Sequence, residues 1–409
     1  MAAAGSLAAW ITIGRIRAHA IILALCLWGL YAWNMATPGL RDRAGNLKGT
    51  DFLHFYTLGS LAVAHRGADL YNMQAQAGLA AQRVPAAAGI RYLPLYPPQV
   101  SMLFAPLARL PYGWALVLWL TVTMSIYAAC AYALWRACPN LRDEGLTVLI
   151  LAAAFPAFWH LIAWGQTSAL ALGCFTLAFF ALRAERDFLA GLAFGCLIFK
   201  PQLVVAVAVV FVVTARWRLI SGAILAAAAQ LAAAWVYYGL EPLRTWVTTL
   251  LRTPSLLPLL EPKPYQTHSL RTFWSMLVPW PEVSLVLYVI TAALALAATI
   301  LCWRRSGLSL SVRFSTLLLA SALVAPHLTV YDLVILGPVF LLLADWGIVH
   351  SEEASNLGIL LYALYAAFLL GPLTRWTHVQ LSVLVMAALL LWTWKLARRS
   401  VGVTVAIPS

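Results

Sequence analysis

Apolar segments long enough to cross a membrane constrain the fold of this chain more than any other feature. A spanning helix needs about 20 mostly apolar residues, because the hydrocarbon core of a bilayer is roughly 30 Å thick. About twelve segments qualify: 18–36, 113–135, 146–163, 168–183, 188–199, 203–215, 218–238, 283–303, 312–325, 329–347, 356–372 and 377–396. The two shortest, 188–199 and 203–215, fit the interior of a bundle as broken helices. We therefore predict an all-α polytopic membrane protein.

The composition agrees with a lipid environment. Only 10% of the 409 residues are charged and 63% are hydrophobic, whereas a soluble domain carries about 25% charged residues. The net charge of +13 comes from basic residues scattered between apolar segments, which the positive-inside rule explains better than nucleic-acid binding. The six cysteines show no metal-ligand spacing, so neither a zinc site nor a disulfide framework is indicated. We expect membrane lipids, and no nucleic acid, as partners.

The basic residues also predict the orientation of the chain. With the N-terminus in the cytoplasm, every short connection assigned to that side is basic, as the rule requires. The residues concerned are Arg136, Arg142, Arg183, Arg186, Arg216, Arg218, Arg304, Arg305, Arg313, Lys395, Arg398 and Arg399. Two long loops, 37–112 and 239–282, then lie on the extracytoplasmic side of a single transmembrane domain covering residues 1–409. Long loops translocate largely regardless of their charge.

Six polar or aromatic motifs fall on or near this outer face. They are Asp51 in KGTDFLHFY, YLPLYPPQ (92–99), WGQTS (164–168), FKPQL (199–203), THSLR (267–271) and APHLTVYD (325–332). One interpretation of Thr50 and Asp51 is a helix cap, since their side chains accept hydrogen bonds from free backbone N–H groups. Independent caps are not expected to gather on one face of a bundle, so the convergence favours a functional site.

Lys200 and Asp332 are ionisable residues within or beside apolar segments. A charged side chain at the position of Lys200 is either functional or reaches the interface by snorkelling, and position alone does not separate the two. Asp332 should face a polar cavity or a partner, with Lys200, His327 and Arg271 as the alternatives. The structural interpretations of the remaining candidates are a plain turn for Gln166, a helix end for His327, and a solvated loop for His268 and Arg271.

The six motifs on the outer face support one kind of chemistry better than others. The sequence has no glycine-rich phosphate loop, no Cys/His cluster and no second acid in a D-x-D arrangement with Asp51. This argues against a tightly held metal and against nucleotide sugars as donors, and we expect no cofactor. A single carboxylate can take a proton from a hydroxyl while cations hold a departing lipid-linked phosphate. Aromatic rings can stack on sugars, although they are also ordinary interface anchors.

Four motifs in the first half of the chain resemble the GT-C superfamily and, more narrowly, glycosyltransferase family 87. They are TDFLHFYTLGSLAVAHRGADLYN (50–72), YPPQVSMLFAPLARLP (96–111), GQTSALALGCFTLAF (165–179) and RDFLAGLAFGCLIFKPQ (186–202). The second half matches mainly in hydropathy and in APH (325–327). The resemblance implies a GT-C type bundle of about twelve transmembrane helices with two long extracytoplasmic loops. It also implies a bacterial inner (cytoplasmic) membrane, with the active site on the extracytoplasmic face.

The resemblance further implies a polyprenyl-phosphate-sugar-dependent glycosyltransferase that inverts the anomeric carbon. It would move a sugar, with mannose the first expectation, to a hydroxyl of a lipid-linked or envelope glycan acceptor. Asp51 matches the family's presumed catalytic base, while Lys200 and His327 match residues expected near the donor phosphate, to which we add Arg271. The substrate-binding candidates are His54, Tyr56, Tyr96, Gln166, Gln202, His268 and Asp332. The sequence LTVYD after His327 departs from the aromatic-rich sequence that some members of the family have at this position. The role of Asp332 and the identity of the acceptor therefore stay open.

An alternative from a different class is a flippase or transporter that moves a lipid-linked sugar without bond chemistry. Transporter sites tend to lie near the bilayer midplane and often show repeat symmetry. The chain has no convincing internal repeat, and its polar motifs are expected on one face. These two observations favour the transferase.

Overall fold

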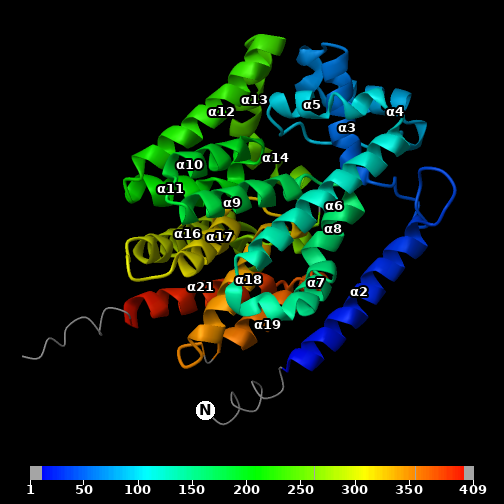
Figure 1. The fold of residues 1–409 in the computed structure, drawn as a ribbon. Coiled ribbons are helices and arrows are strands. Elements are labelled where there is room, and N and C mark those ends of the chain that lie inside the picture. Colours follow the sequence, from blue (N-terminus) through cyan, green and yellow to red (C-terminus); the bar gives the residue numbers. More distant parts are fainter. Residues whose placement is uncertain (1–11, 262, 355, 400–409) are drawn as a thin grey trace, which may run out of the picture.

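The computed structural model describes residues 12–399 except 262 and 355, and the regular elements of that part of the chain are helices (Figure 1). The α-helices are α2 (Ile13–Met35), α3 (Thr50–Val63), α4 (Met73–Arg83), α5 (Gln99–Phe104), α6 (Tyr112–Arg136), α7 (Gly145–Ala153), α8 (Pro156–Trp164), α9 (Ser168–Arg183), α10 (Asp187–Gly195), α11 (Val205–Val213), α12 (Trp217–Tyr238), α13 (Glu241–Leu251), α14 (Thr253–Leu260), α15 (Leu270–Leu277), α16 (Pro281–Trp303), α17 (Leu310–Val324), α18 (Gly337–Val349), α19 (Leu357–Ala367), α20 (Thr374–Thr377) and α21 (Leu381–Arg399). Short 3-10 helices join some of them, among them η4 (Pro139–Glu144), η5 (Cys196–Phe199), η6 (Pro201–Leu203), η8 (Val330–Leu336) and η9 (Gly371–Leu373).

The predicted apolar segments are helical, but they differ in length. Among the described residues, 6 helices are long and apolar enough to cross a membrane, or up to 8 if each of two bent pairs is one span. The six are α2, α6, α12, α16, α21 and the continuous unit formed by η8 and α18. The bent pairs are η4–α7 with α8, and α19 with η9–α20. Four further apolar helices, 168–183, 187–199, 201–213 and 310–324, are shorter. The structure therefore supports a multi-pass protein, while about twelve crossings remain a prediction.

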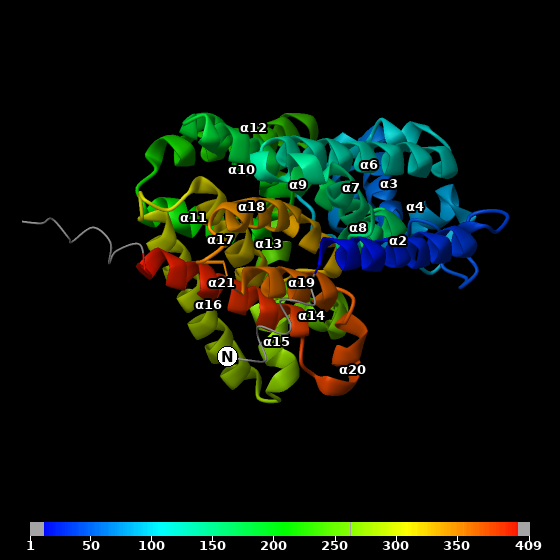
Figure 2. The same ribbon diagram turned by 60° about the horizontal axis from the view of Figure 1, so that its bottom comes forward.

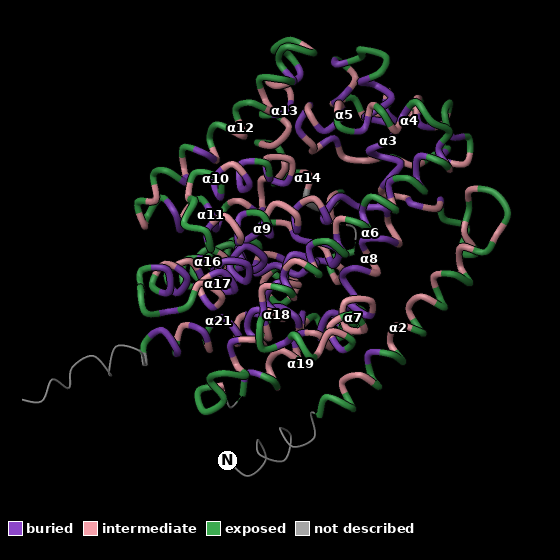
Figure 3. The backbone as a smooth tube through the Cα atoms, viewed as in Figure 1, coloured by how far each residue is buried: buried purple, intermediate pink, exposed green. Residues whose placement is uncertain are grey.

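A helix in the interior of the bundle is surrounded by other helices and is therefore apolar on all of its faces. In α17 every residue from Phe314 to Val324 is buried, and α16, α18, α21 and α11 pack around it. The buried backbone runs through the middle of the molecule (Figure 3). In contrast, α2 lies along one side and buries only Ala20. Two tryptophans hold α2 in place: Trp28 Nε1 donates to the carbonyl of Ala153 at 2.8 Å, and Trp159 Nε1 donates to that of Leu27 at 2.8 Å.

Both regions predicted as long loops contain helices. The segment 37–112 holds α3, α4 and α5, which form a small core of their own with the start of α6. The segment 239–282 holds α13, α14 and α15. In two views α2, α3 and α4 lie at one end of the molecule and the C-terminal end of α21 lies at the other (Figures 1 and 2). The polar motifs on α3, α8 and α9 are thus separated from the basic end of α21.

The orientation of this bundle can be tested with two exposed positions. We expect Ala44→Cys, in the turn before α3, to react with a membrane-impermeant thiol reagent in intact cells. Ser306→Cys, in the basic connection between α16 and α17, should react only after permeabilisation because the positive-inside rule places it in the cytoplasm. Both belong in a background without the exposed Cys26 and Cys196. Labelling in the reverse order would invert the predicted topology.

Candidate active site

Asp51 lies in the first turn of α3, but it does not cap the helix. The cap position is Gly49, which has no side chain to offer, and no side-chain capping bond forms there. Thr50 Oγ1 instead donates to the carbonyl of Leu47 at 2.7 Å. The Asp51 carboxylate accepts a hydrogen bond at Oδ2 from Gln166 Nε2 at 2.9 Å. The capping interpretation of Thr50 and Asp51 is therefore wrong, and Gln166 is more than a turn residue.

Two glycines bring Asp51 and Gln166 together. Gly49 has φ +67°, and a Cβ there would meet Leu116 Cδ1 at 2.4 Å. Gly165 ends α8 with φ +72°, and a Cβ there would meet Phe52 Cβ at 2.8 Å. Only glycine combines this backbone conformation with so close an approach. The start of α3 therefore packs directly against the end of α8, where Gln166 follows.

A cavity of about 440 Å³ lies in front of Asp51. Its walls come from the end of α2, the segment before α3, one face of α8 and the connection between α14 and α15. The charged residues on the wall are Asp51, Asp42 and Lys263, and three tryptophans, Trp33, Trp159 and Trp164, line the same cavity. A partly exposed carboxylate, an ammonium and three tryptophans thus share a cavity beside a helix that is largely exposed.

The environment of Asp51 makes it a better base than an ordinary aspartate. Burial raises its pKa to about 6, and the charge of Asp332 acts in the same direction. The hydrogen bond from Gln166 and the charge of Lys200 oppose this rise. A carboxylate with a pKa near 6 is still mostly ionised at neutral pH and binds a proton more strongly than usual. The side chain therefore has the charge state that a general base needs.

Lys200 and Asp332 form a buried ion pair close to Asp51. Their side chains are 3% and 2% exposed, and Lys200 Nζ lies 2.5 Å from Asp332 Oδ1. Ser168 Oγ accepts from Lys200 at 2.8 Å and donates to Asp332 Oδ1 at 2.6 Å. The backbone N–H and the hydroxyl of Thr329 donate to Asp332 Oδ2 at 3.2 and 3.1 Å. Of the three partners expected for Asp332, Lys200 is confirmed, and the snorkelling interpretation of Lys200 is wrong because its ammonium is buried.

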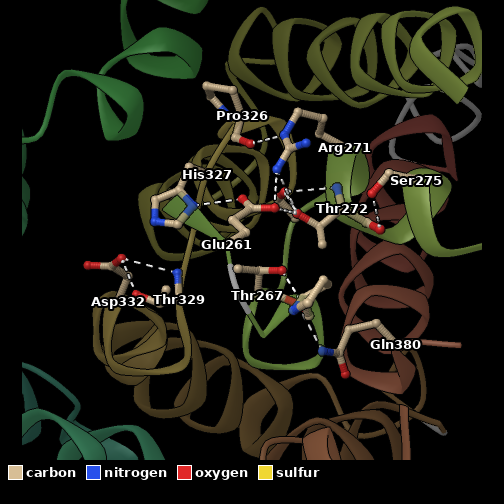
Figure 4. Close-up of polar contacts among 12 residues, drawn as sticks. Glu261, Thr267, Arg271, Thr272, Ser275, Pro326, His327, Thr329, Asp332 and Gln380 are labelled. Carbon is tan, nitrogen blue, oxygen red and sulfur yellow. Dashed lines mark hydrogen bonds and ion pairs between the residues drawn. The ribbon is translucent and has the colours of Figure 1, made fainter. Parts of the chain in front are cut away.

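His327 and Arg271 are brought together by a residue that the sequence did not single out, Glu261 (Figure 4). His327 Nδ1 lies 2.7 Å from Glu261 Oε1, and the Arg271 guanidinium pairs with Oε2 and also donates to the carbonyl of Pro326. Burial alone would raise the pKa of Glu261, but His327 and Arg271 outweigh it and hold the pKa below its usual value. Glu261 is one acid in a proline-rich loop, and no local pattern marks it.

Aromatic side chains pack behind Asp51. The His54 ring stacks on Tyr92 with centroids 4.8 Å apart, and the hydroxyl of Tyr92 donates to the carbonyl of Thr50. Burial lowers the pKa of His54 to about 3, so its imidazole is neutral. The Tyr96 hydroxyl lies 3.5 Å from Gln166 Oε1. His54 and Tyr96 therefore support the site from within the protein.

Three other predicted substrate-binding residues lie apart from this arrangement. The Tyr56 hydroxyl donates to the carbonyl of Leu110 at 2.8 Å, in the core of the α3–α6 region. His268 is buried with Nδ1 2.7 Å from Ser382 Oγ, and burial lowers its pKa to about 3. Gln202 is half-buried in η6. No group of three or more His, Cys, Asp or Glu able to hold a metal occurs in the described part of the chain.

This fold and site define a multi-pass membrane protein with a carboxylate on a cavity beside an exposed helix. The chain belongs to glycosyltransferase family 87, whose match extends over residues 95–330. The match includes Gln166, Lys200 and His327, whereas Asp51 and Asp332 lie outside it. No curated protein and no solved structure matches the chain. Family membership makes the protein a glycosyltransferase, with a sugar donor and an acceptor.

The hydrogen bond from Gln166 gives a pH test of the site. If Asp51 is the general base, as the family resemblance implies, its ionised form is the active one, so turnover should rise with pH and level off above about 6. Gln166→Leu removes the hydrogen bond that lowers the pKa of Asp51, so the rising limb should move to higher pH. Gln202→Leu, which is not bonded to Asp51, is the matched control and should leave the limb in place. An unchanged limb in Gln166→Leu would contradict the assignment.

The buried pair gives a stability test. Lys200→Met leaves the Asp332 carboxylate buried without its counter-charge, which should cost about 3–5 kcal/mol of folding stability. Lys200→Met combined with Asp332→Asn should recover part of that loss. Arg66→Met, which breaks the exposed pair with Asp69, should cost about 0–1 kcal/mol. Thermal unfolding in detergent compares the four proteins. A Lys200→Met protein as stable as Arg66→Met would show that the pair contributes little.

Proposed function

We propose that the protein transfers a sugar, with mannose the first candidate, from a polyprenyl-phosphate donor to an acceptor hydroxyl at the extracytoplasmic face. The acceptor class is a lipid-linked or envelope glycan. The observation that carries the proposal is the placement of Asp51 on the 440 Å³ cavity, with Lys263 on the same wall. A carboxylate base and a cation in one cavity beside a membrane helix suit a reaction between a hydroxyl and a lipid-linked phosphate ester.

The proposed reaction is a single displacement. Asp51 removes the proton of the acceptor hydroxyl as that oxygen forms a bond to the anomeric carbon. The bond between the anomeric carbon and the phosphate oxygen breaks on the opposite face, and the polyprenyl phosphate leaves with the electron pair. Attack on one face and departure from the other invert the anomeric carbon. A phosphate is a good leaving group, so no separate acid is needed.

Cations near Asp51 would stabilise the departing phosphate. Lys263 lines the cavity directly. Arg271 and His327 come from two different segments and both bind Glu261, which lies two residues before Lys263 in the chain. Lys200 contributes through the electrostatic potential at Asp51 rather than by contact, because Ser168 and Asp332 already bind its ammonium. We therefore propose Lys263, Arg271 and His327 as the phosphate-binding group.

The reaction can be tested directly with purified protein and a panel of polyprenyl-phosphate sugars. A transferase releases polyprenyl phosphate when an acceptor hydroxyl is present, whereas a flippase changes the side of the membrane on which the intact donor lies. Release of polyprenyl phosphate that depends on the acceptor is the expected result. Movement of the intact donor across proteoliposome membranes without release would favour the flippase.

The role of Asp51 is tested against a second acid on the same wall. Asp51→Asn keeps the side-chain shape and can still face Gln166, yet removes the basic site, so turnover should fall on the order of 10²–10⁴-fold. Asp42→Asn is the matched control: Asp42 lines the same cavity, but Asn34 and the Asn46 backbone already occupy its oxygens at 3.0 and 2.8 Å. A loss of turnover in Asp42→Asn with normal turnover in Asp51→Asn would assign the base to Asp42 instead.

A further inference from the structure

A second cavity, of about 740 Å³, lies far from Asp51. It is formed by the ends of α9, α16 and α17 together with the turns that join α9 to α10 and α11 to α12. Helix α9 starts at Ser168, beside the Lys200–Asp332 pair, and ends at Arg183 on this cavity. At 1.5 Å per residue, roughly 24 Å of helix separates the two places. The second cavity is therefore not part of the proposed active site.

Positive charge dominates the walls of this cavity. Four arginines line it, against the carboxylates of Glu185 and Asp187: Arg183, Arg216, Arg218 and Arg313. Arg216 pairs with Asp187 at 2.6 Å, and Arg183 donates to a backbone carbonyl at 3.1 Å. Basic residues at this end of the bundle follow from the positive-inside rule. That rule, however, does not require them to surround a cavity.

Three buried hydrogen-bond donors that belong to residues lining this cavity have no acceptor among the described residues. They are Nε of Arg216, Nε of Arg313 and Nε1 of Trp303. The Arg313 guanidinium lies over the Trp303 ring, 5.5 Å from its centroid. Buried donors in native proteins almost always have an acceptor, so donors without one on three residues around the same cavity favour a ligand that supplies oxygen atoms. Because two of the three belong to guanidinium groups, the expected ligand is an anion.

We propose that this cavity binds a phosphate group. Guanidinium groups match the geometry of phosphate oxygens and form charge-assisted hydrogen bonds with them. One phosphate carries enough acceptor oxygens for both arginines and the indole N–H. The source is either free phosphate or the headgroup of an anionic lipid, since the cavity lies where basic residues flank membrane helices. The site is independent of sugar transfer and goes beyond the proposed function.

Thermal unfolding of the full-length protein in phosphatidylcholine nanodiscs tests the site. Inorganic phosphate should raise the unfolding temperature more than sodium chloride of equal ionic strength, because a ligand of the folded state stabilises it. In a parallel arm, phosphatidylglycerol is mixed into the nanodisc lipids. A gain with inorganic phosphate identifies a free anion, and a gain with phosphatidylglycerol alone identifies a lipid headgroup. Asp51→Asn should bind as the wild type does.

Variants of residues that line the cavity test whether the gain in unfolding temperature comes from binding there. Arg313→Gln should weaken the apparent affinity about tenfold or more, as expected for the loss of a hydrogen bond to a charged group. Trp303→Phe removes the indole N–H, keeps a packed ring and should weaken binding less. Arg142→Gln, an exposed arginine in η4 outside the cavity, is the matched control and should keep full affinity.

Two results would overturn the proposal. One is a wild-type protein that gains no stability from either inorganic phosphate or phosphatidylglycerol. The other is an equal gain in the wild type, Arg313→Gln and Trp303→Phe. If Arg313→Gln fails to fold, Arg183→Gln takes its place, because Arg183 is exposed and its loss should leave the bundle intact.

Discussion

The buried ion pair between Lys200 and Asp332 is the interaction on which the active-site end of the bundle depends. An unpaired charge in this position would be very costly, and the pair is tolerated because its oxygens are fully bonded. Ser168 and Thr329 supply the remaining partners, so the start of α9, the η5–η6 junction and the start of η8 are held as one unit. Gln166 lies two residues before Ser168. The fixed start of α9 thereby fixes the side chain that binds Asp51.

The same pair also acts on the pKa of Asp51. Burial is the largest influence on the pKa of Asp51 and raises it, while Lys200 lowers this pKa and Asp332 raises it, so the two charges of the pair oppose each other. The pKa of about 6 thus follows from the position of Asp51 between cavity and protein core, moderated by one hydrogen bond. A change to either member of the pair would disturb this balance. Stability and base strength are therefore coupled at this site, although neither Lys200 nor Asp332 lines the cavity in front of Asp51.

The sequence predicted the elements of the fold far better than their contacts. Hydropathy located the apolar helices because each helix carries its own signal along the chain. It passed over α3 because 14 residues are too few to span a membrane, although nearly all of that helix is buried. The convergence of Asp51, Gln166, Lys200 and Asp332 was expected only as a shared face. Their pairing depends on packing over as many as 164 residues of separation. Glu261 could not be found this way, because its role exists only once Arg271 and His327 meet it.

Glu261 holds two members of the phosphate-binding group that we propose for the sugar donor, Arg271 and His327. Before a donor binds, its carboxylate balances the charge of Arg271 and holds His327 by Nδ1. A histidine bonded to a carboxylate through one nitrogen can offer the other to a second partner. A phosphate leaving the sugar gains negative charge as the glycosidic bond breaks, so a cation held ready by Glu261 interacts more strongly with the transition state than with the bound donor. Stabilisation that grows along the reaction lowers the barrier, whereas uniform binding does not. In the reaction that we propose, Glu261 is the positioning residue for the donor phosphate, as Gln166 is for the base.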